Sequence, residues 1–153
     1  MPMQLTPARA ALAGAFLFLG AAAFAGSIVT AAGELRIPKK EITATARFYE
    51  YRLGNVLLEV LALRAPDGTI RVAFNTCQVC YSSGRGYYTQ KGDVLVCNNC
   101  GNRFKASQVE LIKGGCNPVP ITRDLRTEDA DSIFIPKALF EEAKPLFLNW
   151  KKK

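Results

Sequence analysis

Two Cys-x-x-Cys pairs, Cys77–Cys80 and Cys97–Cys100, constrain the fold of this sequence more than any other feature. Residues 81–96 lie between the pairs, and this spacing is typical of a metal site made of four thiolates. Two residues between ligands let a tight turn aim both sulfur atoms at one point, and a hairpin between the pairs brings the second turn beside the first. We therefore predict one metal site, with the ligands Cys77, Cys80, Cys97 and Cys100.

A disulfide framework is the main alternative interpretation of these cysteines. The chain has five cysteines, so one thiol is left over however the others pair within the chain. A bridge inside each Cys-x-x-Cys pair closes a very small loop and resembles a redox-active dithiol more than a structural cross-link. Thioredoxin-type dithiols open a helix in a βαβ unit, whereas the segments around these pairs have the pattern of strands. We therefore favour metal binding.

The fifth cysteine, Cys116, lies within the segment Gly114-Gly115-Cys116-Asn117-Pro118-Val119-Pro120. Paired glycines before a cysteine and prolines after it fix an unusual loop path. Three roles stay open for Cys116: an additional or alternate metal ligand, a reactive thiol, or a small buried hydrophobic side chain.

The ligands alone do not decide which metal is bound. Four thiolates suit an iron–sulfur cluster, a mononuclear iron or, as the alternative, a structural Zn²⁺. Several aromatic residues near the cysteines are expected either to shield the metal from water or to be ordinary core residues: Phe74, Tyr81, Tyr87 and Phe104.

The chain contains no histidine, which excludes several functions. Ser-His-Asp and Cys-His catalytic pairs are excluded, as are zinc, copper and haem sites with histidine ligands. The motif for covalent haem attachment also fails, because Tyr81 and Gly101 follow the two pairs where it requires histidine. We expect a non-enzymatic metal-binding or electron-transfer protein.

Residues 10–32 form an uncharged run that is apolar on all sides. As a helix this run would be about 34 Å long, enough to cross a hydrocarbon core of about 30 Å. Its most apolar part, residues 10–25, also fits a signal peptide with Ala23-Phe24-Ala25 as the cleavage site. We expect a retained membrane anchor, with a cleaved signal and secretion as the alternative. Both place the rest of the chain outside the cytoplasm.

Most of the remaining sequence has the patterns of β-strands. Alternating or continuous apolar runs, bounded by turn residues, predict strands over residues 43–52, 56–63, 69–75, 86–90, 93–96, 108–112 and 132–135. A helix is expected from Pro136, and Pro145 should end or kink it. The predicted fold is mainly β (a small α+β domain). It has antiparallel strands, two cysteine knuckles of the zinc-ribbon or rubredoxin kind, and one short C-terminal helix.

The predicted organisation follows from these segments. In chain order it has an N-terminal tail (1–9), a transmembrane anchor or signal peptide (10–32), a polar linker (33–40), a Cys-rich metal-binding domain (41–150) and a basic tail (151–153). The net charge is +7. Because the cations are scattered and export is expected, we predict no nucleic-acid partner.

Three blocks of the sequence resemble the FtrD-like family of membrane iron–sulfur proteins. In chain order they are CxVCY at 77–81, VCNNCGxRF at 96–104 and GGCNPVP at 114–120. The order of these blocks is far more specific than a generic zinc ribbon, and the similarity extends from the linker to the C-terminal helix.

The resemblance implies an extracytoplasmic, iron–sulfur-containing domain anchored in the cytoplasmic (inner) membrane and associated with bacterial ferrous-iron uptake. Such a protein would relay electrons beside an iron permease and a cupredoxin-like partner. The family's candidate ligands correspond to Cys77, Cys80, Cys97 and Cys100, with Cys116 in the third block. Some relatives have several membrane spans, whereas this chain has one candidate span, which argues against a permease activity of its own. The alternative function is a structural zinc ribbon that binds a partner or delivers metal without redox activity.

Overall fold

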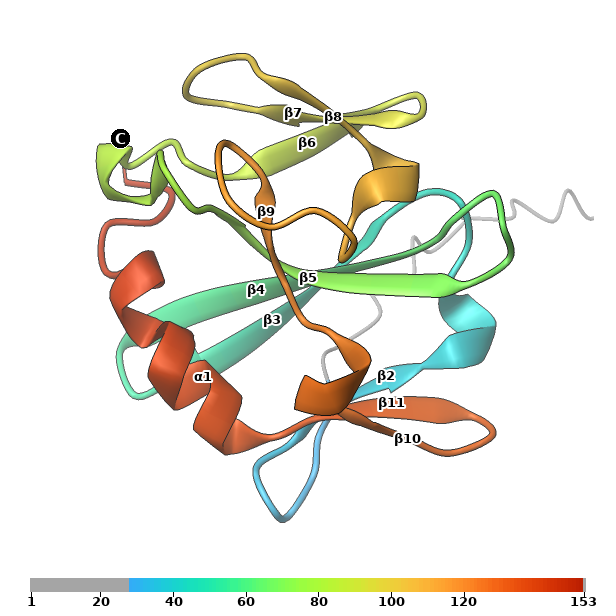
Figure 1. The fold of residues 1–153 in the computed structure, drawn as a ribbon. Coiled ribbons are helices and arrows are strands. Elements are labelled where there is room, and N and C mark those ends of the chain that lie inside the picture. Colours follow the sequence, from blue (N-terminus) through green and yellow to red (C-terminus); the bar gives the residue numbers. More distant parts are fainter. Residues whose placement is uncertain (1–27, 153) are drawn as a thin grey trace, which may run out of the picture.

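The computed structural model describes residues 28–152, which form three antiparallel β-sheets arranged as layers (Figure 1). The first sheet contains, in spatial order, β1 (Ile28–Val29), β2 (Leu35–Pro38), β11 (Ser132–Ile135) and β10 (Thr127–Glu128). The central sheet contains β3 (Arg47–Leu53), β4 (Val56–Arg64), β5 (Ile70–Cys77) and β9 (Pro118–Pro120). The third sheet contains β6 (Tyr88–Lys91), β7 (Val94–Cys97) and β8 (Arg103–Lys105).

Strand β4 is buried on both of its faces because the central sheet lies between the other two. Leu58 and Val60 pack into the main hydrophobic core, on the side of the first sheet. Leu61 and Leu63, on the opposite face, pack into a second core against the third sheet. A strand covered on both faces needs apolar residues without alternation. This explains the apolar run at 56–63 and confirms the prediction of a central strand.

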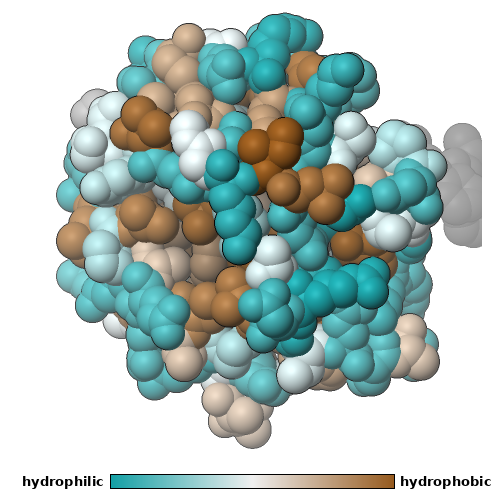
Figure 2. All heavy atoms as spheres, in the orientation of Figure 1, coloured by the Kyte–Doolittle hydropathy of each residue, from teal (hydrophilic) through white to brown (hydrophobic). Residues whose placement is uncertain are grey.

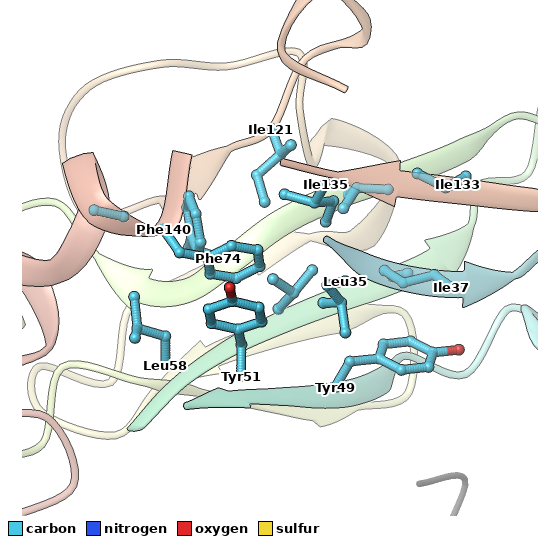
Figure 3. Packing of buried hydrophobic residues seen from close by; sticks show 14 of the residues in the cluster. Leu35, Ile37, Tyr49, Tyr51, Leu58, Phe74, Ile121, Ile133, Ile135 and Phe140 are labelled. Carbon is cyan, nitrogen blue, oxygen red and sulfur yellow. The ribbon is translucent and has the colours of Figure 1, made fainter. Parts of the chain in front are cut away.

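The main core fills the space between the first sheet, the central sheet and the helix α1 (Lys137–Ala143). Figure 3 shows Leu35 and Ile37 of β2 between their own strand and β3, with Leu35 beside Tyr51 and Ile37 over Tyr49. The ring of Tyr51 stacks on Phe140 of α1, with centroids 3.7 Å apart and planes 10° from parallel. An aromatic contact across the core therefore holds the helix against the central sheet. The helix begins directly after Pro136, as the sequence predicts.

The second core contains three of the cysteines, and a fourth packs against it. It lies between the central and third sheets and combines aliphatic side chains with Cys77, Cys80, Cys97, Tyr88 and Phe104, against which Cys116 packs. The hairpin predicted across Lys91-Gly92 is confirmed as β6 and β7, with Lys91 opposite Val94. This hairpin forms the outer wall of the cysteine cluster.

The structure differs from the sequence-based expectation in several segments. Four short strands, β1, β8, β9 and β10, were not expected. Residues 33–40, expected to be a polar linker, contain β2, whose Leu35 and Ile37 are fully buried against β11. Apolar and other residues alternate over only the four residues of β2, which is too short a pattern to indicate a strand among the charged residues of this segment. The strand expected over 108–112 is absent, and a 3₁₀ helix (Ala106–Gln108) is followed by a turn in which Leu111 is exposed.

The C-terminal segment confirms the expected role of proline. Helix α1 ends at Ala143 and continues as a 3₁₀ helix over Lys144–Phe147 that contains Pro145. Proline has no N–H to continue the α-helical hydrogen bonds. Other 3₁₀ helices lie at Lys39–Glu41, Tyr81–Ser83 and Arg123–Leu125.

The predicted membrane anchor or signal over 10–32 lies mostly outside the described residues, and its last residues, 28–32, form β1 and a turn. Within residues 28–152 no helix has the length and apolar character needed to cross a membrane. Hydrophilic side chains cover most of the face of the domain seen in Figure 2.

Candidate metal centre

The first Cys-x-x-Cys pair lies where the central sheet ends. Cys77 is the last residue of β5, and its N–H donates a hydrogen bond to the carbonyl of Gly86 (2.7 Å). The chain then turns, so that the N–H of Cys80 donates to Sγ of Cys77 (3.3 Å). An N–H group directed at sulfur stabilises the thiolate form, which is the form that binds metals.

The second pair repeats this arrangement at the end of the third sheet. Cys97 is the last residue of β7, and its N–H donates to the carbonyl of Asn102 (2.9 Å). The N–H of Gly101 donates back to the carbonyl of Cys97 (2.9 Å). Gly101 has a φ of 73°, a conformation that glycine adopts without strain. Each pair is thus a tight turn at a strand end, but the two turns come from different sheets.

The loop that carries Cys116 is tied to both turns. Gly114 and Gly115 have φ angles of 84° and 72°, so only glycine follows this path without strain. The N–H of Gly114 donates to the side-chain oxygen of Gln78 in the first turn (3.2 Å). The side-chain amide of Asn102, beside the second turn, donates to the carbonyl of Cys116 (2.9 Å). These bonds hold Cys116 between the two pairs.

The sulfur atoms of four cysteines lie within 4.8 Å of one another: Cys77, Cys80, Cys97 and Cys116. Three of these are ligands predicted from the Cys-x-x-Cys spacing. Sγ of the fourth predicted ligand, Cys100, lies 3.1 Å from Sγ of Cys116, beside this group. The structure therefore brings together all five cysteines named from the sequence, with Cys116 inside the group of four and Cys100 at its edge.

Burial differs among the five cysteines. Cys77, Cys80 and Cys97 are buried, Cys116 is half-buried and Cys100 is exposed. All five lie in the described part of the chain and are free thiols. The cluster therefore has a buried side against the second core and one side open to solvent at Cys100.

The pKa values of the cysteines are pulled in opposite directions. Burial raises the pKa of Cys77, but hydrogen bonds from the Tyr88 hydroxyl and from the N–H of Cys80 outweigh burial and leave it below its usual range. Burial raises the pKa of Cys80 to about 11 and also raises that of Cys116. The hydrogen bond with Cys116 lowers the pKa of Cys100 to about 7. Without metal, the cluster therefore contains both thiols and sulfurs that ionise readily.

The cluster has the donor set and the size of a thiolate metal site. With metal–sulfur bonds of about 2.3 Å, a tetrahedron of thiolates around one ion has sulfur–sulfur distances of about 3.8 Å. The sulfurs of Cys77 and Cys116 are 3.3 Å apart, and all pairs in the group of four are within 4.8 Å. A small inward or outward adjustment would therefore let the four sulfurs surround a metal ion.

The four aromatic residues named from the sequence divide between the two roles left open for them. Phe104 packs in the second core with the cysteines, as expected of a shielding residue. Phe74 and Tyr87 belong instead to the main core side, and Tyr81 belongs to neither cluster. The aromatic residue at the cysteines that the sequence analysis missed is Tyr88. It lies directly opposite Cys97 in the β6–β7 hairpin, and opposite residues share a face.

Comparison with known proteins identifies one family. The family described as "membrane iron-sulfur containing protein FtrD-like" matches residues 40–147, a range that includes all five cysteines. No curated protein and no solved structure matches the chain. The family match covers more than half of the chain and confirms the resemblance noted in the three sequence blocks. The chain belongs to the FtrD-like family of membrane iron–sulfur containing proteins.

Proposed function

We propose that this protein binds iron through its cysteine cluster and transfers electrons in bacterial ferrous-iron uptake. The observation that carries the proposal is the convergence of cysteine sulfurs from three separate loops, four of them within 4.8 Å of one another. Thiolates are ligands for iron, iron–sulfur clusters and zinc, and the family description favours iron and sulfur. Iron in such a site, when bound, supplies one-electron redox chemistry.

The residues of the chain have distinct roles in this proposal. Cys77, Cys80 and Cys97 are buried ligands, and the fourth ligand is Cys116 or, as the spacing of the pairs predicts, Cys100. Phe104 and the rest of the second core keep water from the buried side. The exposed side, at Cys100, is the shortest path for an electron to or from a partner protein.

The proposed setting is the extracytoplasmic side of the inner membrane. The apolar run at 10–32 and the word "membrane" in the family description support an anchored chain. An anchored domain of this kind would work beside an iron permease and a cupredoxin-like electron-transfer partner. If the run is a cleaved signal, the same domain would act as a secreted protein.

A structural zinc site is the second candidate, because the size of the cluster fits a single metal ion. A [4Fe–4S] cluster binds each thiolate through a different iron and so separates the sulfurs more than a single ion does. Mutual distances within 4.8 Å fit one four-coordinate ion, either iron or Zn²⁺. In that case the metal would contribute folding free energy, and the domain would bind a partner or deliver metal.

The test is the metal content of the full chain, purified in mild detergent without oxygen and without added metal. Iron, zinc and acid-labile sulfide are measured together with the UV–visible spectrum. Iron with thiolate-to-iron absorption bands that bleach on reduction supports the proposal. One zinc per chain and no colour would refute electron transfer and leave the structural site. Neither metal, with most thiols oxidised, would refute both.

A further inference from the structure

The hydroxyl of Tyr88 is buried inside the cysteine cluster. Tyr88 is 2% exposed, and its hydroxyl oxygen lies 3.7 Å from Sγ of Cys116. Sγ of Cys116 is itself 3.3 Å from Sγ of Cys77, so the hydroxyl contacts a sulfur that lies against the buried first pair.

The side chain of Asn75 fixes the position of Tyr88. Its oxygen accepts a hydrogen bond from the N–H of Tyr88 (2.8 Å), and its amide nitrogen donates to the carbonyl of Tyr88 (3.4 Å). The same nitrogen donates to a carboxylate oxygen of Glu59 (2.7 Å). Asn75 is 1% exposed, so these bonds form away from water. An amide whose oxygen and nitrogen are both engaged has one orientation only.

The C-terminal segment closes this network on its outer side. The indole N–H of Trp150 donates to the backbone carbonyl of Asn75 (2.8 Å). The ammonium group of Lys151 lies 3.3 Å from both carboxylate oxygens of Glu59. A continuous set of hydrogen bonds therefore runs from Lys151 at the surface, through Glu59 and Asn75, to Tyr88 at the sulfurs.

We propose that Tyr88 is a positioning residue of the metal centre, which donates a hydrogen bond from its hydroxyl to the thiolate of Cys116 and is held in place by Asn75. This inference rests on the proposed metal binding. Several thiolates around one site crowd negative charge, and a directed O–H donor in a buried place offsets part of that charge. The donor should therefore strengthen metal binding and make the bound sulfurs weaker electron donors.

The test is a Co²⁺ titration of the reduced full chain without oxygen, comparing wild type with Tyr88→Phe. The matched control is Tyr49→Phe, because Tyr49 is also buried (1% exposed) and its hydroxyl has no hydrogen-bond partner among the described residues. Tyr88→Phe should weaken Co²⁺ binding by about 10- to 100-fold, the usual cost of losing a partner of a metal ligand. It should also move the sulfur-to-cobalt charge-transfer band to lower energy. Tyr49→Phe should leave both unchanged.

A second variant covers the case in which Tyr88→Phe fails to fold. A 3-fluorotyrosine at position 88 keeps the shape of the ring and makes the hydroxyl a stronger donor, so the band should move to higher energy. A band and an affinity that stay at the wild-type values in both variants would overturn the role of Tyr88 while leaving metal binding intact. A wild-type chain that binds no Co²⁺ would overturn the proposed function as well.

Discussion

The sulfur atoms of Cys100 and Cys116 lie 3.1 Å apart, although Cys100 is exposed in the second turn and Cys116 belongs to a separate loop. Sγ of Cys116 is also 3.3 Å from Sγ of the buried Cys77. Cys116 thus connects the buried sulfurs with the exposed one. This position makes it the fourth member of the group of sulfurs within 4.8 Å of one another.

Replacing Cys116 should therefore weaken metal binding more than replacing Cys100. We expect Cys116→Ser to lower the affinity for Co²⁺ by more than about 100-fold, beyond the usual cost of changes outside the ligand set. Cys100→Ser, at the exposed edge, should lower it by less than about 10-fold. Co²⁺ titrations of both variants without oxygen, with loss of free thiols as a check on oxidation, measure the difference. The opposite order would make Cys100 the fourth ligand, as the Cys-x-x-Cys spacing predicts.

The sequence was sufficient to predict much of the site, because the two cysteine turns and the hairpin between them are each formed by residues close together in the chain. The Cys-x-x-Cys pairs are turns at strand ends, and the hairpin between them has the expected place in the chain. The position of Cys116 depends instead on contacts between distant segments, from Gly114 to Gln78 and from Asn102 to Cys116. No pattern in a single sequence reports such contacts.

The surroundings of the cluster were harder to predict for the same reason. Phe74 alternates with Ala73 along β5, and the face that each occupies depends on which sheet covers it. The position of Tyr88 beside the cysteines can be predicted from the sequence, because the register of the hairpin places Tyr88 opposite Cys97. Strand β2 was missed because its partner, β11, lies almost a whole domain away in the sequence.

Gly86 should be essential for the first cysteine turn. A Cβ atom at this position would collide with the backbone carbonyl group of Cys80, and a backbone group cannot rotate away as the end of a flexible side chain can. We expect Gly86→Ala to destabilise the fold by about 1–3 kcal/mol, the usual cost of overpacking, and to weaken metal binding. Urea unfolding and Co²⁺ titration measure the two effects. The control is Gly68→Ala, where nothing lies within 4 Å of the added methyl, so that metal binding should be retained despite local backbone strain.

The buried ion pair of Arg126 and Glu110 should contribute strongly to stability. The Arg126 side chain has no exposed surface, and its Nη1 lies 2.8 Å from a carboxylate oxygen of Glu110. That same oxygen accepts the N–H of Val72 in β5 (3.0 Å). Arg126→Met leaves the carboxylate buried without its cation, which should cost about 3–5 kcal/mol.

Urea unfolding of Arg126→Met measures this cost. The control is Lys137→Met, because Lys137 and Glu141 form an exposed pair whose loss should cost less than about 1 kcal/mol. The double variant Arg126→Met/Glu110→Gln should recover part of the stability, since the unpaired charge is then removed. A double variant no more stable than Arg126→Met would show that the unpaired charge of Glu110 does not cause the loss, which would then come from packing and from the other contacts of Arg126, including its ion pair with Glu128.

Glu128 should make the stability of the fold depend on pH in the acidic range. Burial raises its pKa, but hydrogen bonds from Lys39 and Arg126 outweigh burial and hold the pKa below its usual value. The carboxylate is therefore more acidic in the folded than in the unfolded chain, where its pKa is about 4.3. Its stabilising contribution is fully present above that unfolded-state value and is lost as the pH falls through the lower folded-state value. Urea unfolding at several pH values should show wild type more stable than Glu128→Gln at neutral pH, with the difference shrinking on acidification. A difference for Glu128→Gln that stays constant across the pH range would mean that the lost contacts, not the ionisation, matter.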